Sequence, residues 1–453
     1  MKSLCNITVL LCVTASLWVF DPPSVHANVL LQQQHLTYKG AFRVPRGNLG
    51  GDSSIDSMGR GGKGITYNAA KNSLILLGSQ FENLAIEISI PQPVISNNIS
   101  ELNTSTTIQP PGNITNSKWN NLNLDGSAVG NGGTPGGLLV YDGKLIGNVF
   151  AFYATGYVGH LSHFTASLNW ATEGSQFSGM KRVGTNPTDP ALSNGGFTGG
   201  YMCHVPNDWK ERLGAPALTG NGAIPVISRS SYGPSIWGFD PNDIGVTAIS
   251  PAEMFVGYDD HHQTLGGFSI GNLTFNMVTA LRGIVFPDGS DSILVFGRHG
   301  LGHDRNGVGC YGTGTSNEAL HLTDAGDGSK YCYDPVDGSK GVHGYPYVYQ
   351  IWAYDANDIL NVRKGVKNYW DITPYAVWNF TLPYTDESSG KTGTKSIGGV
   401  AYDPTAQRLF ISQLSSDIAA NAYETPPIIH VFSLNLAITT PPIQSTPIIL
   451  NIK

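Results

Sequence analysis

One short phrase recurs along this chain, and its clearest copy is Gly398-Gly399-Val400-Ala401-Tyr402-Asp403-Pro404-Thr405-Ala406-Gln407-Arg408-Leu409-Phe410-Ile411-Ser412. Two small residues open the phrase, a short apolar run follows, an Asp-Pro pair interrupts it, and a second apolar run returns. Two apolar runs of this length with turn residues between them predict a β-hairpin.

The phrase is repeated elsewhere, so the hairpin is one unit of a larger pattern. Copies occupy residues 62–78, 136–147 and 282–297, and a weaker copy begins at Gly199. Third strands are expected at 84–90 and 428–434, and in the duplicated phrases 236–244 and 351–359. Sheet units repeated at irregular intervals of roughly 60 to 120 residues predict an all-β fold, a β-propeller with five recognisable repeat units. Further blades could lie within 100–135, 165–198 and 360–396, so five to seven blades are allowed.

The two ends of the chain differ in composition from the repeats. Residues 1–27 have the pattern of a secretory signal peptide, with Lys2, an interrupted apolar run and Val25-His26-Ala27 as a cleavage site. Residues 28–437 are expected to form the propeller, with the run 36–45 as an outer strand that closes the ring. Residues 438–453 are a Pro/Thr-rich tail. We therefore expect a secreted or periplasmic monomer with no membrane span after cleavage.

Composition narrows the classes of partner. Charged residues make up 13% of the chain, glycines number 56 and the net charge is −7, which fits many turns in a β-rich fold. No basic stripe is present, so nucleic acid is not an expected partner.

Three cysteines remain beyond the predicted signal peptide. Cys310 and Cys332 lie in one Gly-rich insertion and are the natural disulfide pair in an exported protein. Cys203 is left over and is interpreted as a buried strand thiol.

Loop lengths predict where a site would lie. The turns between first and second strands are short, whereas the loops between second and third strands (the B–C loops) are long and carry polar residues. Binding residues usually occupy the long loops of a rigid scaffold, so the B–C loop face is the expected site.

Polar residues from distant segments are predicted to converge on that face. His with Asp can perform acid–base chemistry, and Arg can hold a carboxylate by two hydrogen bonds. The candidate catalytic residues are His299, His303, Asp304 and Asp259. The candidate substrate-binding residues are His160, Arg229, Tyr232, His261, Arg298 and Tyr345.

Each candidate has a structural alternative. His160 is also explained as a polar loop residue, and the Asp259–His262 stretch as a solvated turn. Asp324–Gly328 and Asp334–Gly338 resemble fragments of calcium loops but lack the Glu of an EF-hand, so Asx-turns are the better interpretation. No cofactor is expected, although structural calcium and a metal at the His-rich loops stay open. Trp237 and Trp352, in the duplicated phrase, are expected to pack within blades.

The phrase from Gly398 to Ile411 and the stretch from Ala215 to Pro234 resemble secreted bacterial β-propeller proteins that lack an assigned activity. The resemblance implies the fold and no particular chemistry; secreted propellers as a class include glycoside hydrolases, polysaccharide lyases, lectins and scaffolds.

The residue types favour a protein that binds or cleaves a glycan, with uronic acids as candidate sugars because of the arginines. If it is an enzyme, a lyase or a glycoside hydrolase is expected, although Asp259 and Asp304 are the only obvious carboxylate pair. The alternative is a non-enzymatic extracellular scaffold that binds a protein or another ligand.

Overall fold

The computed structural model describes residues 29–50, 55–154, 159–184, 195–222, 224–225, 230–258, 261–262, 264–267, 271–419 and 423–436. The predicted signal peptide (1–27) and tail (438–453) lie outside the described residues.

Twenty strands form five four-stranded antiparallel units, here called blades 1 to 5, each ordered from an inner to an outer strand. Blade 1 contains β2 (Thr66–Asn68), β3 (Ser73–Leu77), β4 (Ala85–Ser89) and β5 (Thr107–Gly112). Blade 2 contains β6 (Gly133–Tyr141), β7 (Lys144–Ala151), β8 (His163–Ser167) and β9 (Ser178–Gly184). Blade 3 contains β10 (Tyr201–His204), β11 (Ala217–Gly220), β12 (Ile236–Phe239) and β13 (Ile249–Val256). Blade 4 contains β16 (Ala280–Val285), β17 (Ser292–Gly300), β21 (Tyr347–Asp355) and β22 (Ala376–Phe380). Blade 5 contains β23 (Ile397–Asp403), β24 (Arg408–Gln413), β25 (Ile428–Leu434) and β1 (Leu36–Arg43).

Contacts between the inner strands close the blades into a ring, which confirms the predicted β-propeller. Each inner strand contacts the inner strands of both neighbouring blades, in the order β2, β6, β10, β16, β23 and back to β2. The first strand of the chain, β1, pairs antiparallel with β25 and completes blade 5. The predicted closing strand is therefore confirmed, and the two ends of the propeller are held together by backbone hydrogen bonds.

The three segments that could have held extra blades contribute outer strands instead. They contain β5, β9 and β22, so the described residues form five blades rather than six or seven. Blades 2 and 3 are joined at their outer edges by parallel pairing of β9 with β13, which produces one continuous eight-stranded sheet.

The repeated hairpin turn is held by a buried carboxylate. Asp403 accepts hydrogen bonds from the backbone N–H groups of Thr405 and Ala406 at 3.0 and 3.1 Å, and pairs with Arg408 at 2.7 Å. Gln407 has a φ of 49° at the end of this turn. An Asx-turn thus explains why the Asp-Pro pair reverses the chain.

The duplicated phrase has a local explanation. Its tryptophans, Trp237 and Trp352, lie on third strands and are 1% and 0% exposed, which confirms that they pack within the blades. Its aspartates, Asp240 and Asp355, each accept a hydrogen bond from the backbone N–H two residues later and cap the short helices η5 and α4. The phrase therefore encodes a buried strand followed by a capped helical turn.

The helices are short and lie between strands. The α-helices are α1 (Trp170–Glu173), α2 (Asn207–Leu213) and α4 (Ala356–Arg363). The 3-10 helices are η1 (Gln33–His35), η2 (Ile99–Glu101), η4 (Gly195–Phe197), η5 (Pro241–Asp243), η6 (Glu318–Leu320) and η7 (Tyr369–Asp371). No helix in the described part of the chain is long and apolar enough to cross a membrane.

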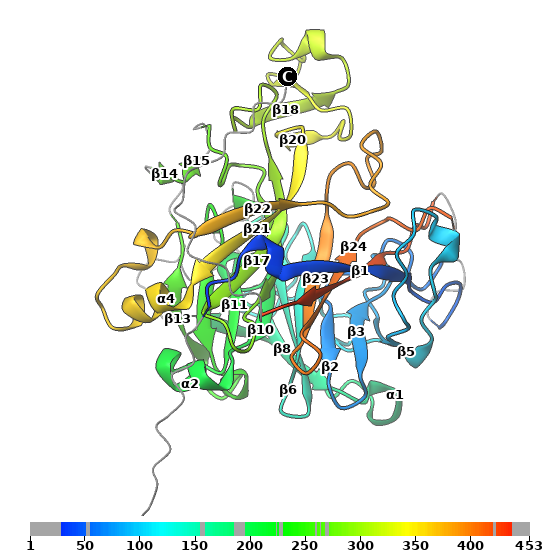
Figure 1. Ribbon diagram of the computed structural model, residues 1–453, viewed down its shortest axis with the longest axis vertical. Helices are drawn as coiled ribbons and strands as arrows, with labels where there is room; N and C mark the ends of the chain where they lie inside the picture. Colours follow the sequence, from blue (N-terminus) through cyan, green and yellow to red (C-terminus); the bar gives the residue numbers. More distant parts are fainter. Residues whose placement is uncertain are drawn as a thin grey trace, which may run out of the picture.

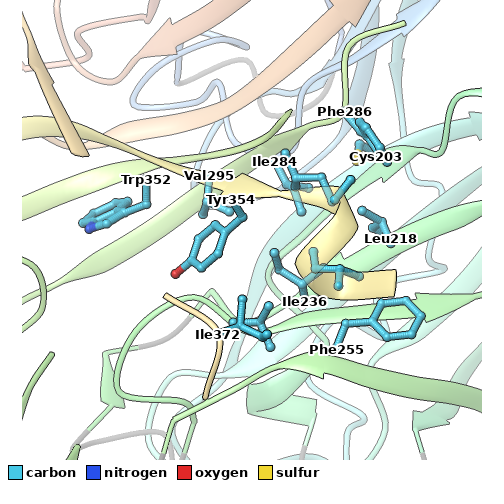
Figure 2. Packing of buried hydrophobic residues seen from close by; sticks show 14 of the residues in the cluster. Cys203, Leu218, Ile236, Phe255, Ile284, Phe286, Val295, Trp352, Tyr354 and Ile372 are labelled. Carbon is cyan, nitrogen blue, oxygen red and sulfur yellow. The ribbon is translucent and has the colours of Figure 1, made fainter. Parts of the chain in front are cut away.

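The hydrophobic core is divided among the spaces between blades. Five clusters of buried apolar side chains fill the contacts of blades 1 and 2, 2 and 3, 3 and 4, 4 and 5, and 5 and 1. Figure 2 shows the third of these, to which blade 3 contributes Cys203, Leu218, Ile236 and Phe255 and blade 4 contributes Ile284, Phe286, Val295, Trp352 and Tyr354. Because each cluster needs two blades, closing the ring is what buries the last one.

Candidate functional site

The largest loop of the B–C face is a small folded unit, residues 301–346, which we call the insertion. It contains β18 (Cys310–Thr315), β19 (Lys330–Tyr333) and β20 (Lys340–His343), with β18 parallel to β19 and antiparallel to β20. Figure 1 shows it at the top, opposite the β2–β3 and β6–β7 turns. A disulfide joins Cys310 and Cys332, as predicted, while Cys203 is a buried free thiol. Disulfides are typical of oxidising compartments, which is compatible with the expected export.

A buried polar network ties the insertion to blade 4. Asp334 accepts a hydrogen bond from the Tyr347 hydroxyl at 2.6 Å and pairs with Nδ1 of His343 at 2.9 Å. Burial by itself lowers the pKa of His343, but the hydrogen bond to Asp334 and the charges of Asp334 and Asp337 outweigh it and raise that pKa. Tyr347 begins β21, so this network fixes the orientation of the insertion on the propeller.

The insertion encloses a cavity of about 240 Å³ that is rich in aromatic and imidazole rings. His303 and His321 face each other with ring centroids 4.5 Å apart. Tyr333 lies edge-on to His303 at 5.3 Å and edge-on to Tyr345 at 5.7 Å. Four rings from four segments of the insertion therefore surround one space.

Two carboxylates lie beside these rings. Nε2 of His303 is 3.5 Å from Glu318 and 3.8 Å from Asp304. The side chains of Glu318 and Asp304 are 67% and 76% exposed, so their attraction to a protonated imidazole is largely screened by water. Both are free to accept hydrogen bonds from a ligand.

Hydrogen bonding fixes the tautomer of His321. The backbone N–H of Tyr333 donates to Nδ1 of His321 at 3.0 Å, so the neutral imidazole carries its proton on Nε2. Burial and the charge of His303 lower the pKa of His321, although Asp304 and Glu318 oppose them. Near neutral pH His321 is therefore a hydrogen-bond donor through Nε2.

Three of the residues predicted from sequence, His303, Asp304 and Tyr345, line this cavity. Its other members, His321, Tyr333 and the adjacent Glu318, were not among the candidates. Tyr333 lies one residue after Cys332 in the same predicted insertion, and this position could have identified it as a candidate. Nothing in the linear order indicated that His321 folds back against His303.

The remaining candidates lie elsewhere. His299 is fully buried on β17, where Nδ1 bonds Thr279 at 3.0 Å and burial lowers its pKa to about 4. Tyr232 is 4% exposed within the cluster between blades 3 and 4. His160 is partly exposed on the β7–β8 loop. Arg298, also on β17, is partly buried and donates to the carbonyl oxygen of Thr394 at 3.0 Å.

Part of the predicted convergence falls on positions that the structure does not describe. Arg229 and Asp259 lie outside the described residues. His261 belongs to β14 (His261–His262), which pairs with β15 (Gly266–Gly267), but its side chain is not described.

The aspartate-rich turns of the insertion have the expected geometry. Asp324, Asp327 and Asp337 each accept a hydrogen bond from the backbone N–H two residues later, at 2.8, 3.0 and 2.9 Å. These are Asx-turns, as predicted. Within the described residues, no group of three His, Cys, Asp or Glu side chains is arranged to hold a metal ion.

No family model and no curated relative matches this sequence. Among solved structures, the chain has partial similarity to a luciferin-regenerating enzyme, with 8% identity, a TM-score of 0.34 and coverage of 90% of this chain and 96% of that one. Similarity to the PQQ-bound aldose sugar dehydrogenase of Streptomyces coelicolor is comparable (10% identity, TM-score 0.32, coverage 88% and 97%). The GH43B protein of a Bacteroides ovatus xyloglucan locus gives 11% identity, a TM-score of 0.36 and coverage of 86% and 53%. Similarities at this level carry no argument about ligand or chemistry.

Proposed function

We propose that this protein binds a glycan outside the cytoplasm, with one sugar unit held in the cavity of the insertion. The observation that carries the proposal is the convergence of Tyr333, Tyr345, His321 and Asp304 around one space, with Glu318 beside His303. Ligand pockets typically combine aromatic walls with a few polar groups that fix orientation, and this cavity has both.

The roles of the side chains follow from their chemistry. The rings of Tyr333 and Tyr345 offer apolar surface to the C–H face of a sugar. Nε2 of neutral His321 donates to a hydroxyl, and Asp304 and Glu318 accept from hydroxyls. A hydrogen bond to a charged acceptor contributes about 1.5–3 kcal/mol. Such a set discriminates sugars by the positions of their hydroxyl groups.

The geometry favours binding over cleavage. A glycosidase needs a carboxylic acid whose pKa is raised by an apolar environment, whereas Asp304 and Glu318 are mostly exposed. A lyase needs a base, whereas the proton on Nε2 makes neutral His321 a donor. Cleavage of a uronic-acid-containing glycan, with His303 as the base, is the second candidate, because His303 lies in the cavity next to both carboxylates.

The test is a comparison of two tyrosine variants against a panel of neutral and acidic polysaccharides. Tyr345→Ala removes a wall of the cavity and is expected to weaken binding at least tenfold by isothermal titration calorimetry. Tyr311→Ala is the matched control, since Tyr311 lies on β18 of the same insertion, is 50% exposed and does not line the cavity. Equal affinity of both variants and the wild type for every glycan that binds would refute the proposed site.

Cleavage is distinguished from binding in the same samples. If the protein only binds, the viscosity of the bound polysaccharide stays constant during incubation with wild-type protein. A fall in viscosity that His303→Ala abolishes would replace the binding proposal with cleavage of the glycan.

A further inference from the structure

The inner strands of the five blades share a two-residue pattern at or near their start, and two blades depart from it. Three of them have Gly-Gly there, beginning at Gly136, Gly199 and Gly398. The corresponding first position is Lys63 in blade 1 and Arg282 in blade 4, and each is followed by the second glycine of the pattern. Two cations therefore replace glycine at equivalent positions around the entrance of the central channel.

Close backbone contacts explain why the position is otherwise glycine. A β-carbon at Gly136 would collide with the carbonyl oxygen of Gly199 on the next blade, and one at Gly398 would collide with that of Gly62. The pairing of β16 with β17 shifts register at Arg282, as the pairings of β6 with β7 and β23 with β24 do at Gly136 and Gly398, so a bulge marks this position in all three blades. We call this entrance, on the B–C loop face, the channel mouth.

Arg282 reaches across the channel mouth. Its guanidinium donates to the carbonyl oxygen of Gly222 in blade 3 and lies 5.2 Å from the ring centroid of Phe150 in blade 2. Phe150 itself lies against Gly222, so the Arg282 guanidinium reaches the point where blades 2 and 3 meet.

A third cation, Arg298, approaches from β17. It donates to the carbonyl oxygen of Thr394, just before β23, at 3.0 Å, and lies 4.8 Å from the ring centroid of Tyr347. Its Nε has no hydrogen-bond partner among the described residues. The Arg298 guanidinium therefore lies beside the start of the inner strand of blade 5. Blade 5 separates blade 4, which carries Arg282, from blade 1, which carries Lys63.

None of these three cations has a carboxylate within 4.0 Å in the described part of the chain, and the ammonium of Lys63 has no hydrogen-bond partner there either. Lys395, near the same entrance, differs because it pairs with Glu387. The chain as a whole carries 33 acidic against 26 basic residues, so acids are not scarce. Part-buried charges in proteins are normally paired, which makes this cluster exceptional.

The cations also act on one another. Burial and the charge of Arg282 lower the pKa of Lys63 to about 8, and burial and the charge of Arg298 lower that of Arg282 to about 10. A mutual repulsion of this kind destabilises the unliganded protein and disappears when an anion binds among the three groups.

We propose that the channel mouth is an anion-binding site in which Lys63, Arg282 and Arg298 hold one oxyanion group, a carboxylate, sulfate or phosphate. The guanidinium forks fit two oxygens of such a group, and the Lys63 ammonium adds a point charge. The site is separate from the cavity of the insertion and does not rest on the glycan proposal. A free inorganic oxyanion and the acid group of a sugar are two sources of the same chemistry.

The test compares Lys63→Met with Lys144→Met, an exposed lysine on the opposite face. Sodium phosphate and sodium galacturonate are titrated into each protein at constant ionic strength maintained with NaCl, and the melting temperature and heat of binding are recorded. Saturable stabilisation of the wild type and of Lys144→Met by at least one anion is expected. Lys63→Met should melt higher than the wild type in NaCl alone and lose at least tenfold in anion affinity.

A second variant and a comparison of the two anions complete the test. Arg298→Gln should weaken the same anion at least tenfold, which covers the case in which Lys63→Met perturbs folding. Tighter binding of galacturonate than phosphate identifies a sugar acid as the ligand, and the reverse order identifies an inorganic oxyanion. Stabilisation that NaCl reproduces at equal ionic strength would overturn the proposal. So would stabilisation that Lys63→Met and Arg298→Gln both retain in full. Tyr345→Ala should leave the anion response intact, so failure of the glycan site and of this site are distinguishable.

Discussion

The two ends of the central channel are built by the same five inner strands and have opposite chemistry. One end lies toward the face that carries the short turns between first and second strands, here called the turn face. There, side chains such as Leu138, Met202, Ile284 and Val400 line a mostly apolar cavity of about 100 Å³. At the channel mouth lie Lys63, Arg282 and Arg298, none of which has a carboxylate partner within 4.0 Å among the residues that the structure describes. The difference teaches that the second half of each inner strand packs in the apolar interior, whereas positions near its start can carry charged side chains.

The largest expected effect comes from the apolar end. Phe286 is 2% exposed and packs against Trp209 with ring centroids 5.6 Å apart. Phe286→Ala should lower the free energy of unfolding by about 3–5 kcal/mol, because burial is lost and a cavity remains. Urea unfolding followed by tryptophan fluorescence measures this change. A loss below 1 kcal/mol would show that packing at this end of the channel contributes little to the stability of the protein.

A cation on the turn face provides the sharpest contrast with the mouth. Arg408 is 28% exposed and pairs at 2.7 Å with Asp403, which is 1% exposed. Arg408→Met leaves that buried carboxylate unpaired, so it should lower the free energy of unfolding by about 2 kcal/mol. Lys63→Met, the same kind of change at the channel mouth, should have the opposite sign. If both variants are destabilised equally in urea, the cations at the two ends do not differ in pairing.

The smallest effect concerns groups that burial keeps neutral rather than charged. Burial lowers the pKa of His163 and His430 to about 3, below the ordinary value of 6.5. The unfolded chain therefore binds protons that the native protein does not, and stability should fall as the pH drops from 6.5 toward 3. Each histidine should account for about 1–2 kcal/mol between pH 7 and pH 5.

The variant His430→Gln measures how much of the loss of stability at low pH is due to His430. Glutamine is chosen to retain hydrogen-bonding capacity toward Tyr38 and Gln413, which contact the imidazole at 3.2 and 2.9 Å. The slope of unfolding free energy against pH should be shallower in the variant than in the wild type. Identical slopes would mean that His430 is not neutral at pH 5.

The prediction of the fold rested on local chemistry. The Asp-Pro turn after Tyr402, the tryptophan of each duplicated phrase and the closing strand at 36–45 were all interpreted correctly. A turn, a cap and an apolar period are each decided by residues close in sequence. The outer strands β5, β9 and β22 were not recognised, since Pro, Gly and polar residues obscure the period of β5 and β9, and β22 has only five residues.

The candidate site was predicted only in part. His303, Asp304 and Tyr345 do share a cavity, because one disulfide-bound insertion holds them together. His299 was grouped with them on the basis of spacing, yet strand alternation and the packing of β17 bury it. Sequence spacing within a polar loop does not indicate which side chains face inward.

The sequence by itself determined a β-propeller with repeated hairpins and a disulfide in its longest loop, because those features depend on neighbours along the chain. Only the tertiary structure decided that Arg282 contacts blades 2 and 3, that Arg298 contacts the segment before blade 5 and that His321 folds back on His303. Closing a ring brings together residues that lie hundreds of positions apart, and their distances depend on the angle and packing of all five blades.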